Sequence, residues 1–151
     1  MSWTMWHVCG IGFDCAFASD ENMRKFWNNH INTLTKVYKD TDILEKVSKI
    51  EADIEADPNI SFSAELFEIS ENMTVSEFIA AVMKEETGIN FGFPSLTDDS
   101  EDCVVFFEAY PWGYNEQERS LTMEELVQIM GRYADELGVK VNTDLDLVYA
   151  A

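Results

Sequence analysis

The chain has 151 residues, of which 29 are acidic, 10 are basic and 2 are histidine, and its formal net charge at pH 7 is −19. Its length is typical of one domain, and 46% hydrophobic and 13% aromatic residues argue against disorder. The shortage of clustered bases excludes nucleic acid and an anionic membrane surface as direct ligands. We expect a single compact domain over residues 1–151.

The acidic residues are concentrated in the middle of the chain. Residues 51–118 contain 17 acidic residues and one basic residue, Lys84, which is a net charge of −16. Residues 1–50 contain six of each sign, and residues 119–151 contribute −3. A local excess of this size indicates a surface that meets a positively charged partner.

The first part of the chain predicts one strand followed by helices. Residues 3–9 are rich in strand formers, and Gly10 and Gly12 are expected to end this strand in a turn or bulge. From Ser19, apolar residues recur at three- and four-residue steps as one helical stripe, with His30 at its edge: Met23, Phe26, Trp27, Ile31, Leu34 and Tyr38. A second helix is expected to begin at Thr41 or Asp42 and end at Asp57-Pro58. Residues 60–70 fit a short strand and a helical turn equally well.

The second part of the chain predicts two capped helices and three strands. Capping boxes at residues 74–77 and 122–125 begin helices that end at Gly88 and Gly138. Alternating apolar residues predict strands near 89–93, 103–110 and 145–149. Helices and strands are segregated rather than strictly alternating, so we expect an α+β fold, with a small, mainly antiparallel sheet of about four strands packed with about four helices.

The N-terminal residues and the cysteines bear on the compartment. Residues 1–13 have neither a basic stretch nor a long apolar stretch, so no signal peptide is expected, and no run approaches the ~18 apolar residues of a membrane span. Cys9, Cys15 and Cys103 are an odd set without metal-binding spacing. We therefore expect a cytoplasmic protein with reduced, mostly buried thiols and no membrane contact.

Metal-binding alternatives are weak. His7 and Cys9 share one strand face and could bind zinc with Cys15 or His30, but two such residues on a strand usually belong to the core. The acids of residues 53–57 lack the glycine and glutamate of a calcium loop. Two further acidic groups suit a solvated turn better than a cation site, namely residues 98–102 and the trio Asn142, Asp144 and Asp146. We expect no metal, no cofactor and no catalytic residue.

An aromatic loop stands out among the acids. Trp112 and Tyr114 lie on a Pro-Gly turn, and large aromatic side chains with a charged rim are typical of interface hot spots. The alternative is that Trp112 folds back over a sheet edge. The predicted partner-binding residues are Asp98, Asp99, Glu101, Asp102, Glu108, Trp112, Tyr114, Glu116 and Glu118.

The charge density of the central segment approaches that of a nucleic acid. If the surface of residues 51–118 is proportional to their fraction of the chain, 16 net charges lie on roughly 3,500 Å², or about 220 Å² each. Duplex DNA presents one charge per roughly 100 Å². The segment is therefore within about twofold of DNA.

In size, charge and aromatic content the chain resembles small acidic inhibitors of phages and mobile elements, the anti-restriction and anti-CRISPR proteins that imitate DNA. The run Tyr110-Pro111-Trp112-Gly113 and residues 120–125 are also similar to a segment of uncharacterised small acidic proteins, which implies no activity. The first resemblance implies an inhibitor of the basic nucleic-acid-binding surface of a nuclease or effector complex in a bacterial host cell. The alternatives are an immunity- or antitoxin-like binder of a basic protein and a non-catalytic housekeeping α+β module.

Overall fold

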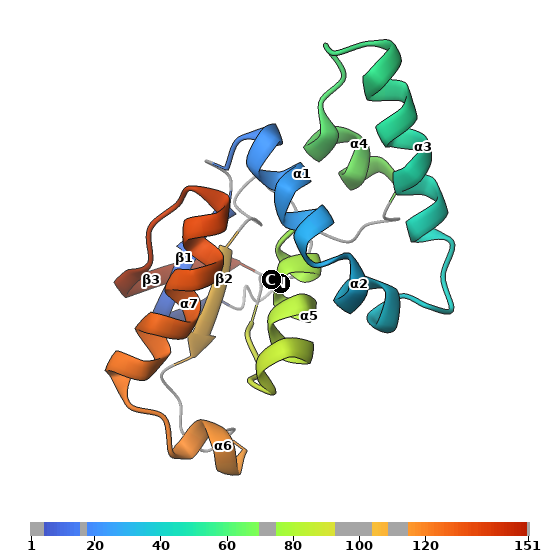
Figure 1. The fold of residues 1–151 in the computed structure, drawn as a ribbon. Helices are drawn as coiled ribbons and strands as arrows, with labels where there is room; N and C mark the ends of the chain where they lie inside the picture. Colours follow the sequence, from blue (N-terminus) through green and yellow to red (C-terminus); the bar gives the residue numbers. More distant parts are fainter. Residues whose placement is uncertain (1–4, 16–17, 70–74, 93–103, 109–114, 151) are drawn as a thin grey trace, which may run out of the picture.

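The computed structural model describes residues 5–15, 18–69, 75–92, 104–108 and 115–150. Within these ranges the chain forms seven helices and a small antiparallel sheet of three strands (Figure 1). The elements in chain order are β1 (Met5–Asp14), α1 (Asp20–Asn29), α2 (Ile31–Val37), α3 (Ile43–Ala56), α4 (Phe62–Ile69), α5 (Val75–Thr87), β2 (Val104–Glu108), α6 (Glu116–Arg119), α7 (Met123–Leu137) and β3 (Asn142–Ala150). The α+β class and the antiparallel sheet are confirmed.

Strand β1 lies at the centre of the sheet, whose order is β2-β1-β3. Gly10 pairs with Glu108 on one side and with Leu145 on the other. The strand continues to Asp14, so the expectation that it ends at the glycines is wrong, because pairing with two neighbours keeps this segment extended. The pairing with β3 shifts register between Gly10 and Gly12, which agrees with the predicted bulge.

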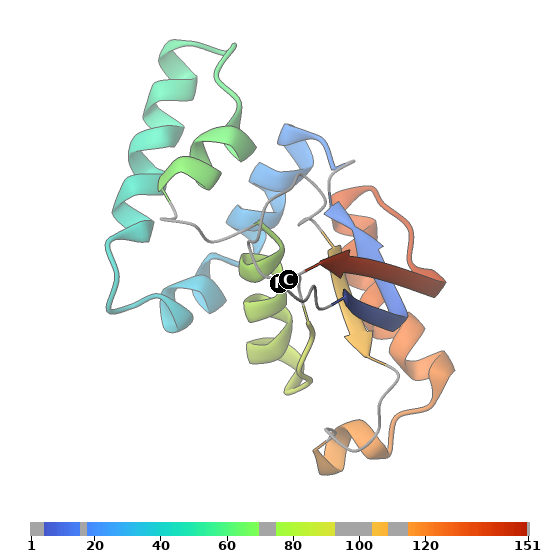
Figure 2. The same cartoon turned by 180° about the vertical axis from the view of Figure 1, so that it is seen from behind.

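The helices lie at different distances from the sheet. Helix α7 lies over one face of the sheet, and the view from behind shows the strands in front of it (Figure 2). Helix α1 contacts α7, and α5 contacts β2. Helices α3 and α4 contact each other on the far side of α1 from the sheet (Figure 1).

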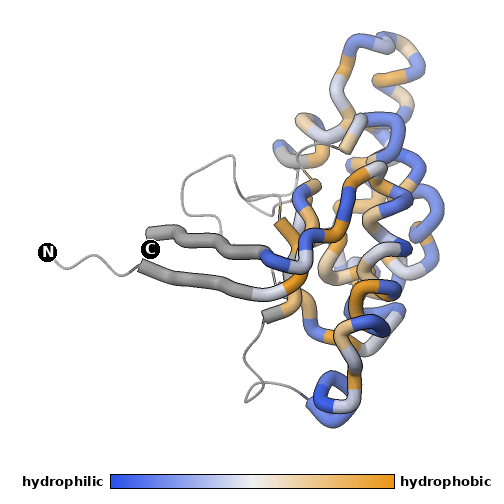
Figure 3. Tube along the Cα trace, turned by 90° about the vertical axis from the view of Figure 1, so that its left-hand side faces the viewer, coloured by the Kyte–Doolittle hydropathy of each residue, from blue (hydrophilic) through white to orange (hydrophobic). Residues whose placement is uncertain are grey.

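The core lies between the helices and the sheet. Trp27 of α1 makes edge contacts with Phe62 of α4 and Phe78 of α5, at centroid distances of 6.3 and 5.6 Å. From the sheet side, Phe13 and Val105 are buried. Each large apolar side chain buried in this way contributes about 1.5–3 kcal/mol. Hydrophobic and hydrophilic residues alternate along the helices, as one-sided burial requires (Figure 3).

The first predicted helix is two helices. His30 has φ −109° and ψ 20° and separates α1 from α2. The apolar stripe is buried as expected except at Ile31, which is 39% exposed and directly follows the break. Helices α4 and α6 add to the predicted number, and residues 62–69 of the ambiguous segment form the helix α4.

Several predicted helix ends are confirmed. The Ser19 and Thr122 hydroxyls accept hydrogen bonds from the N–H groups of Asn22 and Glu125, both at 3.1 Å. Helix α3 ends at Ala56, before Asp57. Helices α5 and α7 end at glycines with positive φ, 76° at residue 88 and 72° at residue 138. The capping residue proposed at position 74 lies outside the described residues.

The predicted strand at 89–93 does not form in its described part, residues 89–92. Ile89 and Phe91 are buried, but their backbone is not part of a sheet ladder, and Gly92 forms only an isolated bridge. The alternating apolar pattern therefore reflects the burial of these side chains and not the pairing of a strand. The three described strands replace the four expected.

Candidate functional site

Most of the predicted partner-binding residues lie outside the described parts of the chain. This applies to the acidic turn and the aromatic loop, which hold Asp98, Asp99, Glu101, Asp102, Trp112 and Tyr114. Glu108 is described only through its backbone, which pairs with Gly10 at the end of β2. These assignments stay predictions.

Glu118 belongs to a complete capping box at the start of α6. The Asn115 side chain accepts the N–H of Glu118, and Glu118 Oε1 accepts the N–H of Asn115, both at 2.8 Å. Glu118 Oε2 accepts the N–H of Asn90 at 2.7 Å, and the residue is 4% exposed. Its carboxylate therefore holds α6 to the segment after α5 and is not part of the exposed acidic surface.

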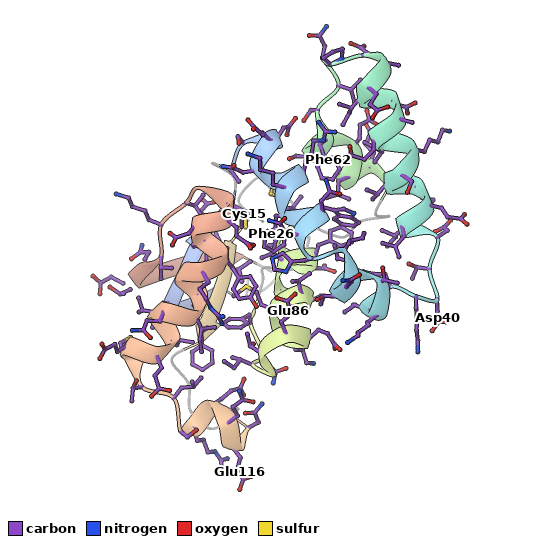
Figure 4. All side chains as sticks on the ribbon, viewed as in Figure 1. Cys15, Phe26, Asp40, Phe62, Glu86 and Glu116 are labelled. Atoms are coloured by element: carbon purple, nitrogen blue, oxygen red, sulfur yellow. The ribbon has the colours of Figure 1, made fainter. Side chains whose placement is uncertain are left out.

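Glu116, by contrast, is exposed and points away from the body of the molecule (Figure 4). The neighbouring Gln117 donates to the Thr87 carbonyl at 2.8 Å. Helix α6 is thus fixed by Glu118 and Gln117 and leaves Glu116 free to contact solvent. The Asn-x-x-Glu spacing of residues 115–118 is the sequence signal that would have separated the two glutamates.

The exposed acids described within residues 51–118 lie on or directly after four helices. They are Asp53, Glu55 and Asp57 at the end of α3, Glu68 of α4, Glu85 of α5 and Glu116 of α6, and we call them the exposed acidic set. Glu86 of α5 is exposed as well but is left out of the set, because its carboxylate contacts other side chains of the fold. Helices α3 and α6 lie at opposite ends of the molecule (Figure 1). The set therefore spans the described structure and does not form one small patch.

The acids of α3 occupy an electrostatically unfavourable position. The helix has no basic residue in its last turn, where Asp53 and Glu55 face the negative end of the helix dipole. Each such carboxylate destabilises a helix by about 0.3–1 kcal/mol. Glu51 differs, because Arg24 of α1 donates to both of its oxygens. The stability of the helix therefore does not explain why α3 carries the further acids Asp53 and Glu55 after Glu51.

A second group of titratable side chains surrounds His30, between α1, α5 and α7. His30 Nδ1 lies 2.7 Å from Glu86 Oε2, and His30 Nε2 lies 2.6 Å from Glu136 Oε2. Glu86 also accepts hydrogen bonds from Thr33 Oγ1 at 2.6 Å and from the Tyr133 hydroxyl at 2.9 Å. Figure 4 places Glu86 near Phe26, whose ring centroid lies 4.5 Å from that of His30.

The pKa values in this cluster follow from the contacts. Burial lowers the pKa of His30, but hydrogen bonds to Glu136 and Glu86 outweigh it, so the pKa is raised. Burial raises the pKa of Glu86, but hydrogen bonds from Thr33, His30 and Tyr133 outweigh it and lower the pKa. Burial, and then the hydrogen bond to Glu86, raises the pKa of the Tyr133 phenol. The cluster therefore favours a protonated ring beside an ionised carboxylate.

This cluster is not arranged for acid-base catalysis. Carboxylates occupy both ring nitrogens of His30, and its side chain is 12% exposed. A general base needs a nitrogen within hydrogen-bond reach of a substrate proton. The sequence singled out His30 only as a possible zinc ligand, and its actual partners are 56 and 106 residues away in the chain.

Within the described residues, no group of three or more His, Cys, Asp or Glu side chains is placed to hold a metal ion. Cys15 is a buried thiol of the core. The side chains of His7 and Cys9 lie outside the description, so the zinc alternative is not tested there.

An open depression of about 580 Å³ lies against α7. Its described lining residues all belong to that helix: Glu125, Gln128, Ile129, Gly131, Arg132 and Asp135. The lining mixes two acids, one base and one large apolar side chain. It selects no ligand class by its chemistry.

Comparison with known proteins gave no relative. No protein-family model, curated protein or solved structure matches the chain. Among the described helices, none is both long enough and apolar enough to cross a membrane.

Proposed function

We propose that this protein is an acidic, non-catalytic inhibitor that occupies the basic nucleic-acid-binding surface of a nuclease or effector complex, in the manner of an anti-CRISPR or anti-restriction DNA mimic. In this proposal it acts in the cytoplasm of a bacterial cell, needs no cofactor and does not itself bind nucleic acid. The single observation that carries the proposal is the net charge of −16 within residues 51–118.

The placement of the exposed acidic set supports this function. These carboxylates point outward from ordered helices, so they can face a partner without unfolding the chain. They are spread from α3 to α6, and charge spread over this length suits a groove or channel better than a single point contact. The acids at the end of α3 oppose their own helix dipole, which is understandable if they serve binding and not stability.

The charge density remains comparable with DNA when the actual surface is used. The chain exposes 9167 Å². A proportional share for residues 51–118 gives about one net charge per roughly 260 Å², within about threefold of duplex DNA. Such a surface speeds association with a basic partner by roughly 10–1000-fold at low salt.

The test is a competition experiment with purified proteins. We would immobilise the protein, present a panel of nucleases with basic DNA channels, and measure binding at low and at high salt. We expect at least one nuclease to bind, salt to weaken binding, and duplex DNA to displace the nuclease. Binding that DNA cannot displace would instead indicate the immunity-like binder of a basic protein. No binding to any member at low salt would contradict the proposal.

Two variants that each lose three acids show whether binding depends on the position of the charges or only on the net charge. The triple variant Asp53→Asn, Glu55→Gln, Asp57→Asn removes three charges at the end of α3. The control removes three exposed charges outside residues 51–118, through Asp40→Asn, Glu124→Gln and Asp144→Asn. We expect the first variant to weaken nuclease binding several-fold more than the control. Equal effects would mean that only net charge matters.

The predicted acidic turn has its own test. Replacing Asp98, Asp99, Glu101 and Asp102 by lysine should weaken binding and inhibition several-fold, because four contacts to a basic surface become repulsive. Unchanged affinity would exclude this turn from the interface. It would leave the exposed acidic set as the contact surface.

A further inference from the structure

We propose that His30 is a proton-operated clamp, which holds the α1–α2 junction to α5 and α7 when both ring nitrogens carry a proton and loosens the junction when one proton is lost. This regulation goes beyond the proposed inhibitory function and does not depend on it. It rests on the positions of His30, Glu86 and Glu136.

The argument begins with the number of protons. An ionised carboxylate only accepts hydrogen bonds, whereas a neutral imidazole has one donor and one acceptor nitrogen. Both nitrogens of His30 lie within 2.7 Å of carboxylate oxygens. Two such contacts are satisfied together by the imidazolium, and Glu86 is held ionised by three donors. The observed geometry is therefore that of the protonated ring.

The groups facing His30 from each neighbouring element favour this charge. Helix α5 supplies Glu86, and α7 supplies Glu136 together with the Tyr133 ring, whose centroid lies 5.7 Å from that of His30. The Thr33 hydroxyl of α2 donates to Glu86. One cation, Arg132, lies 5.9 Å from the centroid of the Tyr133 ring. Two acids thus contact the ring directly.

Deprotonation has a defined structural consequence. The neutral ring can donate to only one carboxylate, so the other then faces a nitrogen lone pair and the contact becomes repulsive. His30 is also the residue between α1 and α2, where its carbonyl accepts the N–H of Leu34 at 2.9 Å. Losing one anchor therefore releases the junction from either α5 or α7.

The direction of the pH effect follows from the raised pKa of His30. The stabilisation is complete below the ordinary value of about 6.5 and is lost as pH rises through the folded-state pKa. The ordinary pKa values of aspartate, glutamate and lysine lie well away from neutrality. The chain has a second histidine, His7, which is therefore replaced in the test below.

The first experiment is an NMR titration of His30 in a His7→Gln background. We expect the imidazole to titrate above 6.5, and both Glu86→Gln and Glu136→Gln to lower its pKa. Glu21→Gln is the matched control, because Glu21 is an exposed acid of α1 paired with Lys25. A ring that titrates at or below 6.5, or that ignores both glutamine substitutions, would overturn the proposal.

The second experiment reads out the junction itself. Amide hydrogen exchange, corrected for the intrinsic pH dependence, should show protection at residues 30 and 34 falling several-fold between pH 5.5 and pH 9. Protection in the middle of α3 should stay constant. In Glu136→Gln, the fall should be much smaller, and His30→Gln should show none if it folds. An equal change across the whole chain, or no change at the junction, would contradict the clamp.

Discussion

The carboxylate of Asp20 lies against the first turn of α4, where its Oδ2 accepts the N–H of Phe62 at 3.1 Å. Its other oxygen accepts the N–H of Ser63 at 3.4 Å. Asp20 is itself the first residue of α1, so one side chain satisfies two of the unpaired N–H groups of a helix more than 40 residues later. This contact joins α1 to the α3–α4 pair.

Replacing Asp20 by alanine should therefore destabilise the protein by about 1–2 kcal/mol, because two N–H groups of α4 lose their acceptor. Asp20→Asn keeps one acceptor and should cost less. Chemical denaturation monitored by tryptophan fluorescence measures both changes. Glu21→Gln removes a neighbouring exposed acid and should change stability by less than ~0.5 kcal/mol. Equal effects of Asp20→Ala and Glu21→Gln would show that the contact is energetically unimportant.

The same contact predicts a pH dependence. Burial raises the pKa of Asp20, but hydrogen bonds from the side chains and backbone at residues 61–63 outweigh burial and lower it. Its contribution is therefore present above the ordinary value near 3.8 and is lost as pH falls through the lower folded-state value. The stability difference between the wild type and Asp20→Asn should shrink as pH falls below about 4. A constant difference down to pH 2 would contradict this assignment.

Replacing Glu118 is predicted to lower the stability of the fold, whereas replacing Glu116 is predicted to change mainly the surface charge. Glu118→Ala leaves the N–H groups of Asn90 and Asn115 without their acceptor and should cost about 1–3 kcal/mol. Glu116→Ala, two residues earlier and exposed, should stay within about 0.5 kcal/mol. Thermal or chemical unfolding of the two variants checks this. A tolerated Glu118→Ala would mean that water replaces the carboxylate.

Two glycines at α7 should respond oppositely to alanine. Gly138 has φ +72°, and a Cβ there would lie 2.7 Å from Asn22 Nδ2, so Gly138→Ala should destabilise by about 1 kcal/mol or more. Gly131 lies inside the helix, and a Cβ there meets none of the described atoms within 4 Å. Gly131→Ala should stabilise the protein by about 0.5–1 kcal/mol. A shift of unfolding midpoint in the same direction for both would contradict this difference.

The acids at the end of α3 are expected to lower the stability of the protein and to strengthen its binding to a nuclease. The triple variant of Asp53, Glu55 and Asp57 removes acids from the negative end of a helix dipole, so it should raise the free energy of unfolding by about 0.3–1 kcal/mol per charge. The control at Asp40, Glu124 and Asp144 loses an acid from the first turn of α7 and should not gain stability. Equilibrium unfolding of both proteins decides this. A stability gain combined with weaker nuclease binding would show that these acids serve recognition.

Local patterns predicted the longer helices well. The apolar spacing of α3 and α7, the hydroxyl caps at Ser19 and Thr122 and the glycines at 88 and 138 all act over a few residues. The break at His30 has no such local signal, because histidine neither fixes φ nor lacks an N–H group. What distinguishes this residue in the fold is its contact with Glu86 of α5 and Glu136 of α7.

The candidate site shows the same division. The nine predicted contact residues are distinguished by charge and aromatic character, and such properties do not reveal which carboxylates bind donors inside the fold. Glu116 and Glu118 are chemically identical and two positions apart. Glu116 is exposed, whereas Glu118 is buried and only 4% exposed. The distant N–H of Asn90 makes the difference.

The amino-acid sequence by itself determined the net charge, its concentration in residues 51–118, the α+β class and most helix ends, because these depend on composition and on neighbours within a few positions. Only the tertiary structure decided that Glu118 and Glu86 hold the fold together while Asp53 and Glu116 face outward. That choice depends on donors brought from 28 to 56 residues away, and no local pattern carries the position of such donors.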